Sequence, residues 1–323
     1  MTWRAGKSIE CWIAGRSENV WRMLAQMHCA GNGKVGLADS FVARPDLTSK
    51  KKALNMARSR TWAGIAAALL LSSVGAPAVL AQASSGTTFF DAFDDFDSGR
   101  WFISDGWTNG PHQNCWWSRK AVVAQPGEVT LQFLPTARAE RAYLCGEIQT
   151  NAVFGYGTFE ARFRTDVSSG INAAFFTYIG PVHKQPHDEI DFEVLTQDTS
   201  QVSVNTYVNA EPRNGASVPL PAPSEAGFLT YSFIWEPERL RWFVEGKLVH
   251  EATGDDLPTH PQKIYLSHWG TDTLSDWMGS FADPGRPLNM VIDWVAYTAP
   301  GEGCAFKGSV LCSAAVTDEK ALP

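Results

Sequence analysis

The sequence of 323 residues has little of what would indicate a zinc protein, a helical protein or a repeat protein. Its six cysteines and seven histidines are scattered, and no Cys/His group has the spacing of a zinc site. No long stretch shows a helical period, no internal repeat is visible, and nothing inside residues 88 to 300 has the composition of a linker. These absences favour one continuous domain made of short elements.

Basic residues are scarce after residue 81. Residues 1 to 81 hold 11 of the 27 basic and 4 of the 34 acidic residues, so the remainder has 16 basic and 30 acidic side chains and a net charge of −14. A surface of that charge repels polyphosphates. We therefore expect no nucleic-acid partner.

Long apolar runs are also absent, and the most apolar stretch resembles a secretory signal peptide. Residues 56–83 begin with Arg58 and Arg60, continue through the apolar run Trp62 to Leu71, and end in small residues suited to cleavage. The run is short for a membrane-spanning helix, although a buried helix or a membrane anchor are the alternatives. We predict a secreted or periplasmic protein, with no membrane attachment after cleavage. Residues 1–55 lack a clear period, and we interpret them as an over-extended gene start or a long leader outside the fold.

What the remaining residues contain is a series of short alternating segments separated by turn residues. Segment 158–164 alternates apolar with polar side chains, and segment 230–235 places Tyr231, Phe233 and Trp235 on one face. Residues 230 to 250 indicate two consecutive hairpins with turns near Pro237 and Gly246, and we expect another strand over 290–297. This pattern predicts an all-β sandwich or barrel.

We expect one domain over residues 84–300. About 240 residues remain after the signal segment, which is enough for a single large all-β core. We expect this domain to be a monomer. After Pro300 the composition becomes small and polar, and we interpret residues 301–323 as a tail.

Three carboxylates alternate with two large apolar residues in the segment from Glu189 to Glu193. On a β-strand Glu189, Asp191 and Glu193 share one face, and Ile190 and Phe192 share the other. Three carboxylates this close in a partly desolvated site cannot all stay ionised, so at least one should hold its proton near neutral pH. A protonated acid beside an ionised carboxylate is what glycoside hydrolysis needs. The alternative is a solvated strand face that is simply acidic.

The spacing of the two glutamates is compatible with a retaining glycosidase. Cα atoms four residues apart on a strand are about 13 Å apart, and two long side chains that lean inward can approach the separation of about 5 to 5.5 Å that a retaining enzyme needs. Asp191 is too short to reach the same sugar atom, so we expect it to tune a neighbour's protonation.

Aromatic residues support a sugar-binding cleft, because the apolar faces of sugar rings pack on aromatic rings. The chain has 13 tryptophans. Any one of them can belong to the core, but Trp269 and Trp277 lie in a segment that we interpret as a polar loop. The candidates for sugar contact are Trp107, Trp116, Trp269 and Trp277, with Asn205 and Tyr207.

Several motifs occur in family order from about Phe89 to Pro300: Gly106-Trp107-Thr108-Asn109-Gly110, Asn114-Cys115-Trp116, Cys145-Gly146-Glu147, Phe154-Gly155-Tyr156-Gly157, Phe175-Phe176-Thr177-Tyr178, Asp188 to Glu193, Asn205-Thr206-Tyr207 and Ser275-Asp276-Trp277-Met278-Gly279. On these motifs the chain resembles the bacterial lichenase branch of glycoside hydrolase family sixteen, the endo-β-1,3-1,4-glucanases. It is most similar to the members that cut the exopolysaccharide succinoglycan.

The resemblance implies a β-jelly roll of two antiparallel sheets with a substrate cleft on its concave sheet. It implies that Glu189 is the nucleophile, that Glu193 is the general acid and then base, and that Asp191 supports both. The residues that it implies for the sugar subsites are Trp107, Asn109, Glu147, Asn205, Tyr207, Trp269 and Trp277.

The resemblance also implies a disulfide between Cys115 and Cys145, and we expect a second between Cys304 and Cys312, since an exported protein can keep disulfides. No organic cofactor is required. A structural calcium is carried by some relatives, and Asp293 matches one contributor to that site.

Three residues depart from the lichenase pattern. His187 replaces a common Trp, Gln149 a common Arg, and Ser267 a common Asn. None belongs to the carboxylate trio, so they bear on the preferred polysaccharide and favour a branched bacterial exopolysaccharide over cereal glucan.

We therefore predict a secreted endo-β-glucanase with a polysaccharide substrate. The alternatives are a transglycosylase on the same scaffold and a non-catalytic β-glucan-binding protein, which would have no need of the acidic trio.

Overall fold

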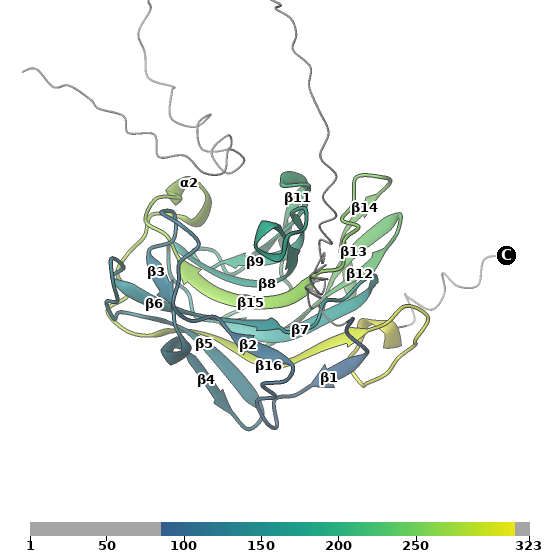
Figure 1. The fold of residues 1–323 in the computed structure, drawn as a ribbon, viewed down its shortest axis with the longest axis horizontal. Coiled ribbons are helices and arrows are strands. Elements are labelled where there is room, and N and C mark those ends of the chain that lie inside the picture. Colours follow the sequence, from purple (N-terminus) through teal and green to yellow (C-terminus); the bar gives the residue numbers. More distant parts are fainter. Residues whose placement is uncertain (1–84, 314–323) are drawn as a thin grey trace, which may run out of the picture. The chain divides into compact units, whose positions relative to one another are not determined.

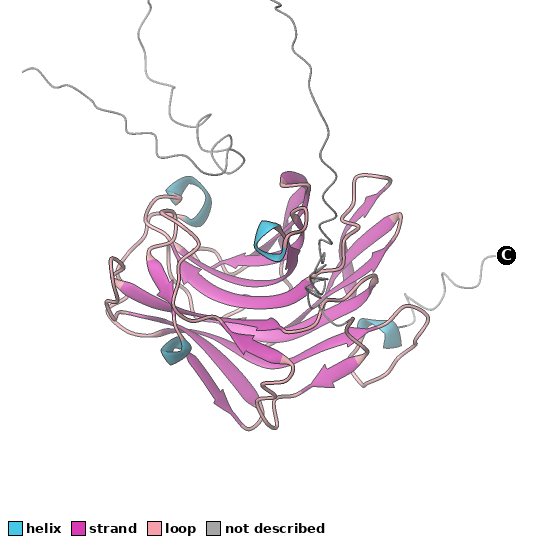
Figure 2. Ribbon diagram, in the orientation of Figure 1, coloured by secondary structure: helices cyan, strands magenta, loops and turns pink. Residues whose placement is uncertain are grey.

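The computed structural model describes residues 85–313, and nearly all of the regular secondary structure in this part of the chain is β-strand (Figures 1 and 2). The all-β prediction is confirmed. Within these residues the helical elements are single turns: α2 (Ser275–Met278), η1 (Arg119–Ala121), η2 (Pro181–His183) and η3 (Val310–Cys312). The predicted signal segment, residues 56–83, and residues 1–55 lie outside the described residues.

The first layer of strands is long and curved, as β15, β8 and β9 show in Figure 1. Its strands pair in the order β11 (Glu211–Pro219), β10 (Gln201–Val208), β9 (Asp188–Leu195), β8 (Ile171–Ile179), β15 (Lys263–Gly270) and β6 (Tyr143–Thr150), with the short β2 (Trp101–Ile103) and β3 (Cys115–Trp117) along β6. Their pairing is antiparallel except between β3 and β6.

The second layer packs against the first and has the order β5 (Glu128–Leu134), β16 (Leu288–Thr298), β7 (Gly157–Thr165), β12 (Leu229–Glu236), β13 (Arg239–Val244) and β14 (Lys247–Thr253), with β4 (Val122–Gln125) beside β5 and β1 (Phe89–Asp91) beside β16. The two layers are continuous at one side, where Phe133 and Leu134 of β5 pair with Cys145 and Leu144 of β6. The result is the expected sandwich, with one sheet folded over on itself.

The two predicted hairpins are confirmed. Strands β12, β13 and β14 follow one another and pair as neighbours. Between β13 and β14, Glu245 and Gly246 have φ values of 49° and 72°. Positive φ at both central residues defines the tight turn that matches the twist of paired strands, and glycine adopts it without a steric cost.

Aromatic side chains from both layers form the core. Phe175 of β8 lies 6.4 Å from Phe192 of β9 and 5.7 Å from Phe233 of β12, which in turn stacks on Phe159 of β7 at 4.9 Å between ring centroids. All four rings are fully buried, and each contributes about 1.5–3 kcal/mol through burial. Because Phe192 is anchored in this way, its neighbours along β9 are held on the opposite face.

Part of the segment after Pro300, which we interpreted as a tail, packs on the domain. The Cys304–Cys312 disulfide is formed, and Val310 is buried. The backbone N–H of Val310 donates to the buried carboxyl of Glu160 on β7 at 2.8 Å. Composition missed this contact because a small, polar segment looks solvated until its buried partner is known.

No helix within residues 85–313 is long and apolar enough to cross a membrane.

Candidate active site

A cleft of about 690 Å³ opens over the first layer. Its floor consists of alternate residues of β9, β8, β15 and β6, and its walls come from the segment around residues 102–117 and from residues 182–187. The residues that line the cleft include Phe102, Trp107, Asn109, His112, Gln113, Trp117, Glu147, Gln149, Ala174, Phe176, Tyr178, His183, His187, Glu189, Asp191, Glu193, Lys263, Tyr265, Ser267 and Trp269.

Strand pairing arranges the floor in rows that run across β9, β8, β15 and β6. The rows are Glu193–Ala174–Ser267–Glu147, Asp191–Phe176–Tyr265–Gln149 and, over the first three strands, Glu189–Tyr178–Lys263. Neighbouring strands are about 4.8 Å apart, so residues two strands apart in a row have backbones about 10 Å apart.

The acidic trio lies on the cleft face of β9, as the alternation predicts. Glu189, Asp191 and Glu193 all line the cleft, whereas Ile190 and Phe192 point into the core and are fully buried. Strand β9 is therefore held in the core by Ile190 and Phe192 and presents the three carboxyl groups to the cleft.

Glu193 is set up to carry a proton near neutral pH. Burial, helped by the charge of Glu189, raises the pKa of Glu193 to about 7. Asn172 of β8 opposes this rise, because its Nδ2 donates to Oε1 of Glu193 at 2.8 Å and favours the ionised form. The proximity of the three carboxylates predicted a proton on one of them, and burial is the larger cause of the raised pKa of Glu193.

Glu189 lies in a more polar position. Nε2 of His187 lies 2.6 Å from Oε2 of Glu189. The imidazole stacks on Tyr207 of β10 with ring centroids 5.0 Å apart and meets the edge of Tyr178 at 5.1 Å. The sequence marked His187 only as a departure from a family pattern, and its contact with Glu189 was missed.

Asp191 separates the two glutamates and is buried. Burial and the charges of Glu189 and Glu193 raise the pKa of Asp191 well above its ordinary value. Its carboxyl makes hydrogen-bonding contact with Glu189 and with Asn205, the residue that pairs with it on β10. Two carboxyl groups can share such a bond only when one of them is protonated, and the raised pKa of Asp191 favours a proton on that residue.

Of the predicted subsite residues, Trp107, Asn109, Glu147 and Trp269 line the cleft. The remaining three, Asn205, Tyr207 and Trp277, lie beside the cleft. Trp277 is 38% exposed, and its ring centroid lies 6.2 Å from that of Trp269.

Two local expectations for the tryptophans were wrong. Trp269 belongs to strand β15, not to a polar loop, and it shares the cleft face of that strand with Ser267. Trp117, not Trp116, lines the cleft from β3, because adjacent strand residues point to opposite faces.

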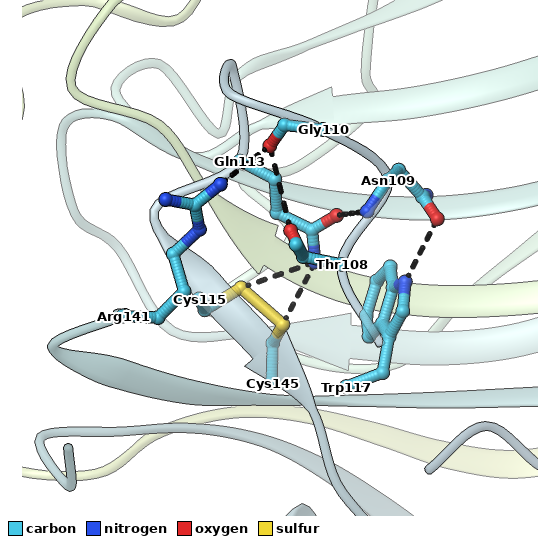
Figure 3. Close-up of a disulfide and its surroundings, with 8 residues drawn as sticks. All are labelled: Thr108, Asn109, Gly110, Gln113, Cys115, Trp117, Arg141 and Cys145. Carbon is cyan, nitrogen blue, oxygen red and sulfur yellow. Dashed lines mark hydrogen bonds between the residues drawn. A yellow bond between two sulfur atoms is a disulfide. The ribbon is translucent and has the colours of Figure 1, made fainter. Parts of the chain in front are cut away.

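The loop that carries Asn109 is braced by the Cys115–Cys145 disulfide (Figure 3). Gln113 connects this loop to the disulfide. Its Nε2 donates to Sγ of Cys145 at 3.1 Å, and its Oε1 accepts from the backbone N–H of Asn109 at 2.9 Å. Nε1 of Trp117 donates to Oδ1 of Asn109 at 3.1 Å. The disulfide thus fixes the direction in which the Asn109 amide faces the cleft.

Glu147 is a second carboxyl group with a proton near neutral pH. Burial raises its pKa to about 7, against a hydrogen bond that Ser104 Oγ donates to its Oε1 at 2.5 Å. The same Ser104 Oγ accepts from Nε2 of Gln149 at 3.3 Å, and Oε1 of Gln149 accepts from Nζ of Lys263 at 3.1 Å.

The sequence analysis did not find several cleft residues of β8 and β15. Phe176, Tyr178, Lys263 and Tyr265 all line the cleft, as does His183, whose Nε2 lies 3.1 Å from the hydroxyl of Tyr265. The period of two in each strand could have found these residues once their register with β9 was known.

The resemblance offered Asp293 as a contributor to a structural calcium site. The carboxylate of Asp293 is paired with the guanidinium of Arg162, and residues 85–313 contain no group of three or more His, Cys, Asp or Glu side chains that could hold a metal ion.

Comparisons with known proteins agree with the motifs. The model of "Glycosyl hydrolases family 16" matches residues 109–296. The endo-1,3-1,4-beta-glycanase ExoK of Rhizobium meliloti is 50% identical over 226 residues, which is 70% of this chain and 84% of that protein. A beta-glucanase of Bacillus subtilis is 37% identical over 71% of this chain and 93% of its own length.

A solved beta-1,3-1,4-glucanase (lichenase) from a mouse hindgut metagenome superposes with a TM-score of 0.63 at 36% identity, over 66% of this chain and 99% of that one. The jelly-roll prediction and the predicted family are therefore confirmed. The chain belongs to glycosyl hydrolase family 16 and is a glycoside hydrolase that needs no cofactor.

Proposed function

We propose that the protein is an endo-acting β-glucanase that hydrolyses internal β-1,3-1,4-type bonds with retention of configuration. The names of its relatives support this activity. The observation that carries the proposal is the pair of glutamates on one strand face. Glu193 is partly buried and has a pKa raised to about 7, and Glu189 is in contact with a polar imidazole.

In the first step Glu193 donates its proton to the glycosidic oxygen while Glu189 attacks the anomeric carbon. The bond to the leaving sugar breaks, and a glycosyl ester with Glu189 forms. Asp191 donates a hydrogen bond to the carboxylate of Glu189 and so keeps one oxygen directed at the sugar.

In the second step Glu193 acts as the base. Esterification removes the charge of Glu189, which is one of the causes that raise the pKa of Glu193. The pKa of Glu193 therefore falls in the intermediate, and the carboxylate accepts a proton from the water that cleaves the ester. The chemistry needs no group beyond these side chains and water.

The substrate that we propose is a succinoglycan-like bacterial exopolysaccharide or a mixed-linkage glucan. The departures at His187 and Gln149 lie in the cleft itself, so they bear on the choice of polymer. Incubation with lichenan, laminarin, xyloglucan, agarose and succinoglycan, with products identified by mass and linkage, tests this choice. Product analysis in dilute substrate also separates hydrolysis from transglycosylation.

Two variants test the mechanism. Glu189→Gln should abolish turnover while polysaccharide binding persists, and turnover at the wild-type rate would contradict the nucleophile assignment. Glu193→Ala should keep part of its activity on an aryl glycoside whose leaving group needs no protonation. Equal loss on activated and natural substrates would exclude Glu193 as the acid.

We also propose export, with residues 56–83 as the signal peptide, and a monomeric mature enzyme. Bacterial expression of the full chain followed by N-terminal sequencing of the extracellular and periplasmic protein tests the cleavage site. Light scattering of the purified product measures its mass.

A further inference from the structure

Lys263 is a cation in a cleft whose other strong charges are acidic. It is the first residue of β15 and lies in the same floor row as Glu189, with Tyr178 of β8 between them. Among the described residues that line the cleft, it is the one lysine or arginine.

The ammonium group of Lys263 has a neutral partner. Its Nζ donates to Oε1 of Gln149 at 3.1 Å, and it takes part in none of the ion pairs found within residues 85–313. Burial lowers the pKa of Lys263, and no neighbouring carboxylate offsets that effect. Partial desolvation of an ammonium without a counter-ion is unfavourable, so this arrangement calls for a reason.

Hydrogen bonds through Ser104 fix the orientation of the Gln149 amide. Its Nε2 donates to Ser104 Oγ at 3.3 Å, and Ser104 Oγ donates to Glu147 at 2.5 Å. Gln149 can therefore present only its oxygen to Lys263. This contact uses one of the three N–H groups of the ammonium, which leaves donors for a ligand in the cleft.

The neighbouring side chains do not supply the missing anion. His183 lies close enough for the charge of Lys263, together with burial, to lower the histidine's pKa, and its Nε2 is engaged with the hydroxyl of Tyr265. Tyr178 has its pKa raised to about 12 by burial and by the charge of Glu189, so it remains neutral. Neither His183 nor Tyr178 therefore supplies a negative charge to Lys263.

We propose that Lys263 forms a subsite for a carboxylate-bearing substituent on a sugar unit of the polysaccharide. The inference rests on the proposed glycanase function and narrows its substrate to an acidic polymer. Because Lys263 is two strands from β9, about 10 Å, the charged unit lies beside the unit whose bond is cleaved. Recognition of one carboxylate by one ammonium makes the position of cleavage depend on where the charged unit occurs.

The test compares two derivatives of one polymer, carboxymethyl lichenan and hydroxyethyl lichenan with equal degrees of substitution. The two substituents are similar in size, and one carries a charge. We expect wild-type kcat/KM to be higher on the carboxymethyl polymer, and we expect this ratio to fall about tenfold in Lys263→Gln, as for the loss of one hydrogen bond to a charged group. Mass spectrometry of the wild-type products should place carboxymethyl groups at a fixed unit relative to the new chain end.

Matched variants separate a local contact from a general effect of charge. Lys263→Arg keeps the cation and should keep most of the preference. Lys120→Gln removes an exposed lysine from η1, away from the lining residues, and should leave the ratio of the two polymers unchanged. The preference should also weaken as NaCl rises to 0.5 M. A ratio that is the same in Lys263→Gln and in the wild type would overturn the proposal.

Failure of the glycanase function would look different. It would appear as no cleavage of lichenan, of either derivative or of succinoglycan by the wild type. Calorimetric binding of both derivatives to Glu189→Gln tests the subsite without turnover. Tighter binding of the carboxymethyl polymer supports the subsite, and equal affinities overturn it.

Discussion

Removal of the Asn172 side chain should move the pH range of activity upward. Nδ2 of Asn172 donates to the carboxyl of Glu193 at 2.8 Å and favours its ionised form, which holds the pKa of Glu193 at about 7 despite burial. In Asn172→Ala this donor is absent, so the pKa of Glu193 should rise further. As the general acid, Glu193 must be protonated for the first step, and the variant should therefore stay active at higher pH than the wild type.

The size of this shift follows from the hydrogen bond. A bond to a charged group contributes about 1.5–3 kcal/mol, and one pKa unit corresponds to about 1.4 kcal/mol. The basic limb of the profile of kcat/KM against pH should therefore move up by about 1 to 2 units. Asn172→Asp should move it in the same direction, because a second carboxylate next to Glu193 also disfavours ionisation.

The assay is hydrolysis of lichenan in the wild type and both variants from pH 4 to 10, with thermal unfolding at each pH as a control. Asn172 is fully buried, so Asn172→Ala should lose stability as well, and rates are compared below its unfolding temperature. A basic limb that stays in place, or moves to lower pH, would refute the assignment of Glu193 as the acid controlled by Asn172.

Three further changes have defined outcomes. Ionisation of the buried Glu147 carboxyl, whose pKa is about 7, should lower the free energy of unfolding of the wild type by about 2.5 kcal/mol between pH 5 and pH 8. Glu147→Gln should remove this loss, as urea titrations at the two pH values can measure; an equal loss in both proteins would contradict that pKa. Serine at both Cys115 and Cys145 should lower the free energy of unfolding by about 3–4 kcal/mol for a loop with a sequence separation of 30 and should weaken substrate binding, whereas full retention of KM would show that the Asn109 loop needs no brace. His187→Phe should lower kcat about tenfold, because the contact with Glu189 is lost, and His187→Gln should retain part of the wild-type kcat. Equal kcat in the two variants would exclude a role for that contact.

The sequence was most informative for β9, where one strand contributes residues both to the core and to the cleft. In the segment from Glu189 to Glu193 the period of two separates a core face from a cleft face, and both faces are where that period places them. The hairpin turn at Gly246 was likewise predictable, because a two-residue turn with positive φ has a local chemical signature.

The remaining parts of the site depend on contacts between distant residues. Asn172 reaches Glu193 across 21 positions, and Gln149 reaches Lys263 across 114. No local pattern encodes these pairs, since they arise from the register of β8 and β15 with their neighbours. The buried contact of Glu160 with the segment near Val310 was hidden for the same reason.

The raised pKa values of two glutamates in the cleft couple activity to stability. Glu147 and Glu193 each have a folded pKa of about 7, above the ordinary value of 4.5. A carboxyl group whose pKa is raised by folding contributes stability that is fully present below its unfolded pKa and is lost as pH rises through the folded pKa. The same rise in pH deprotonates the general acid. Stability and turnover should therefore decline together as the pH approaches and passes 7, and because Glu193 cannot be changed without loss of the acid, Glu147 is the position at which the two can be separated.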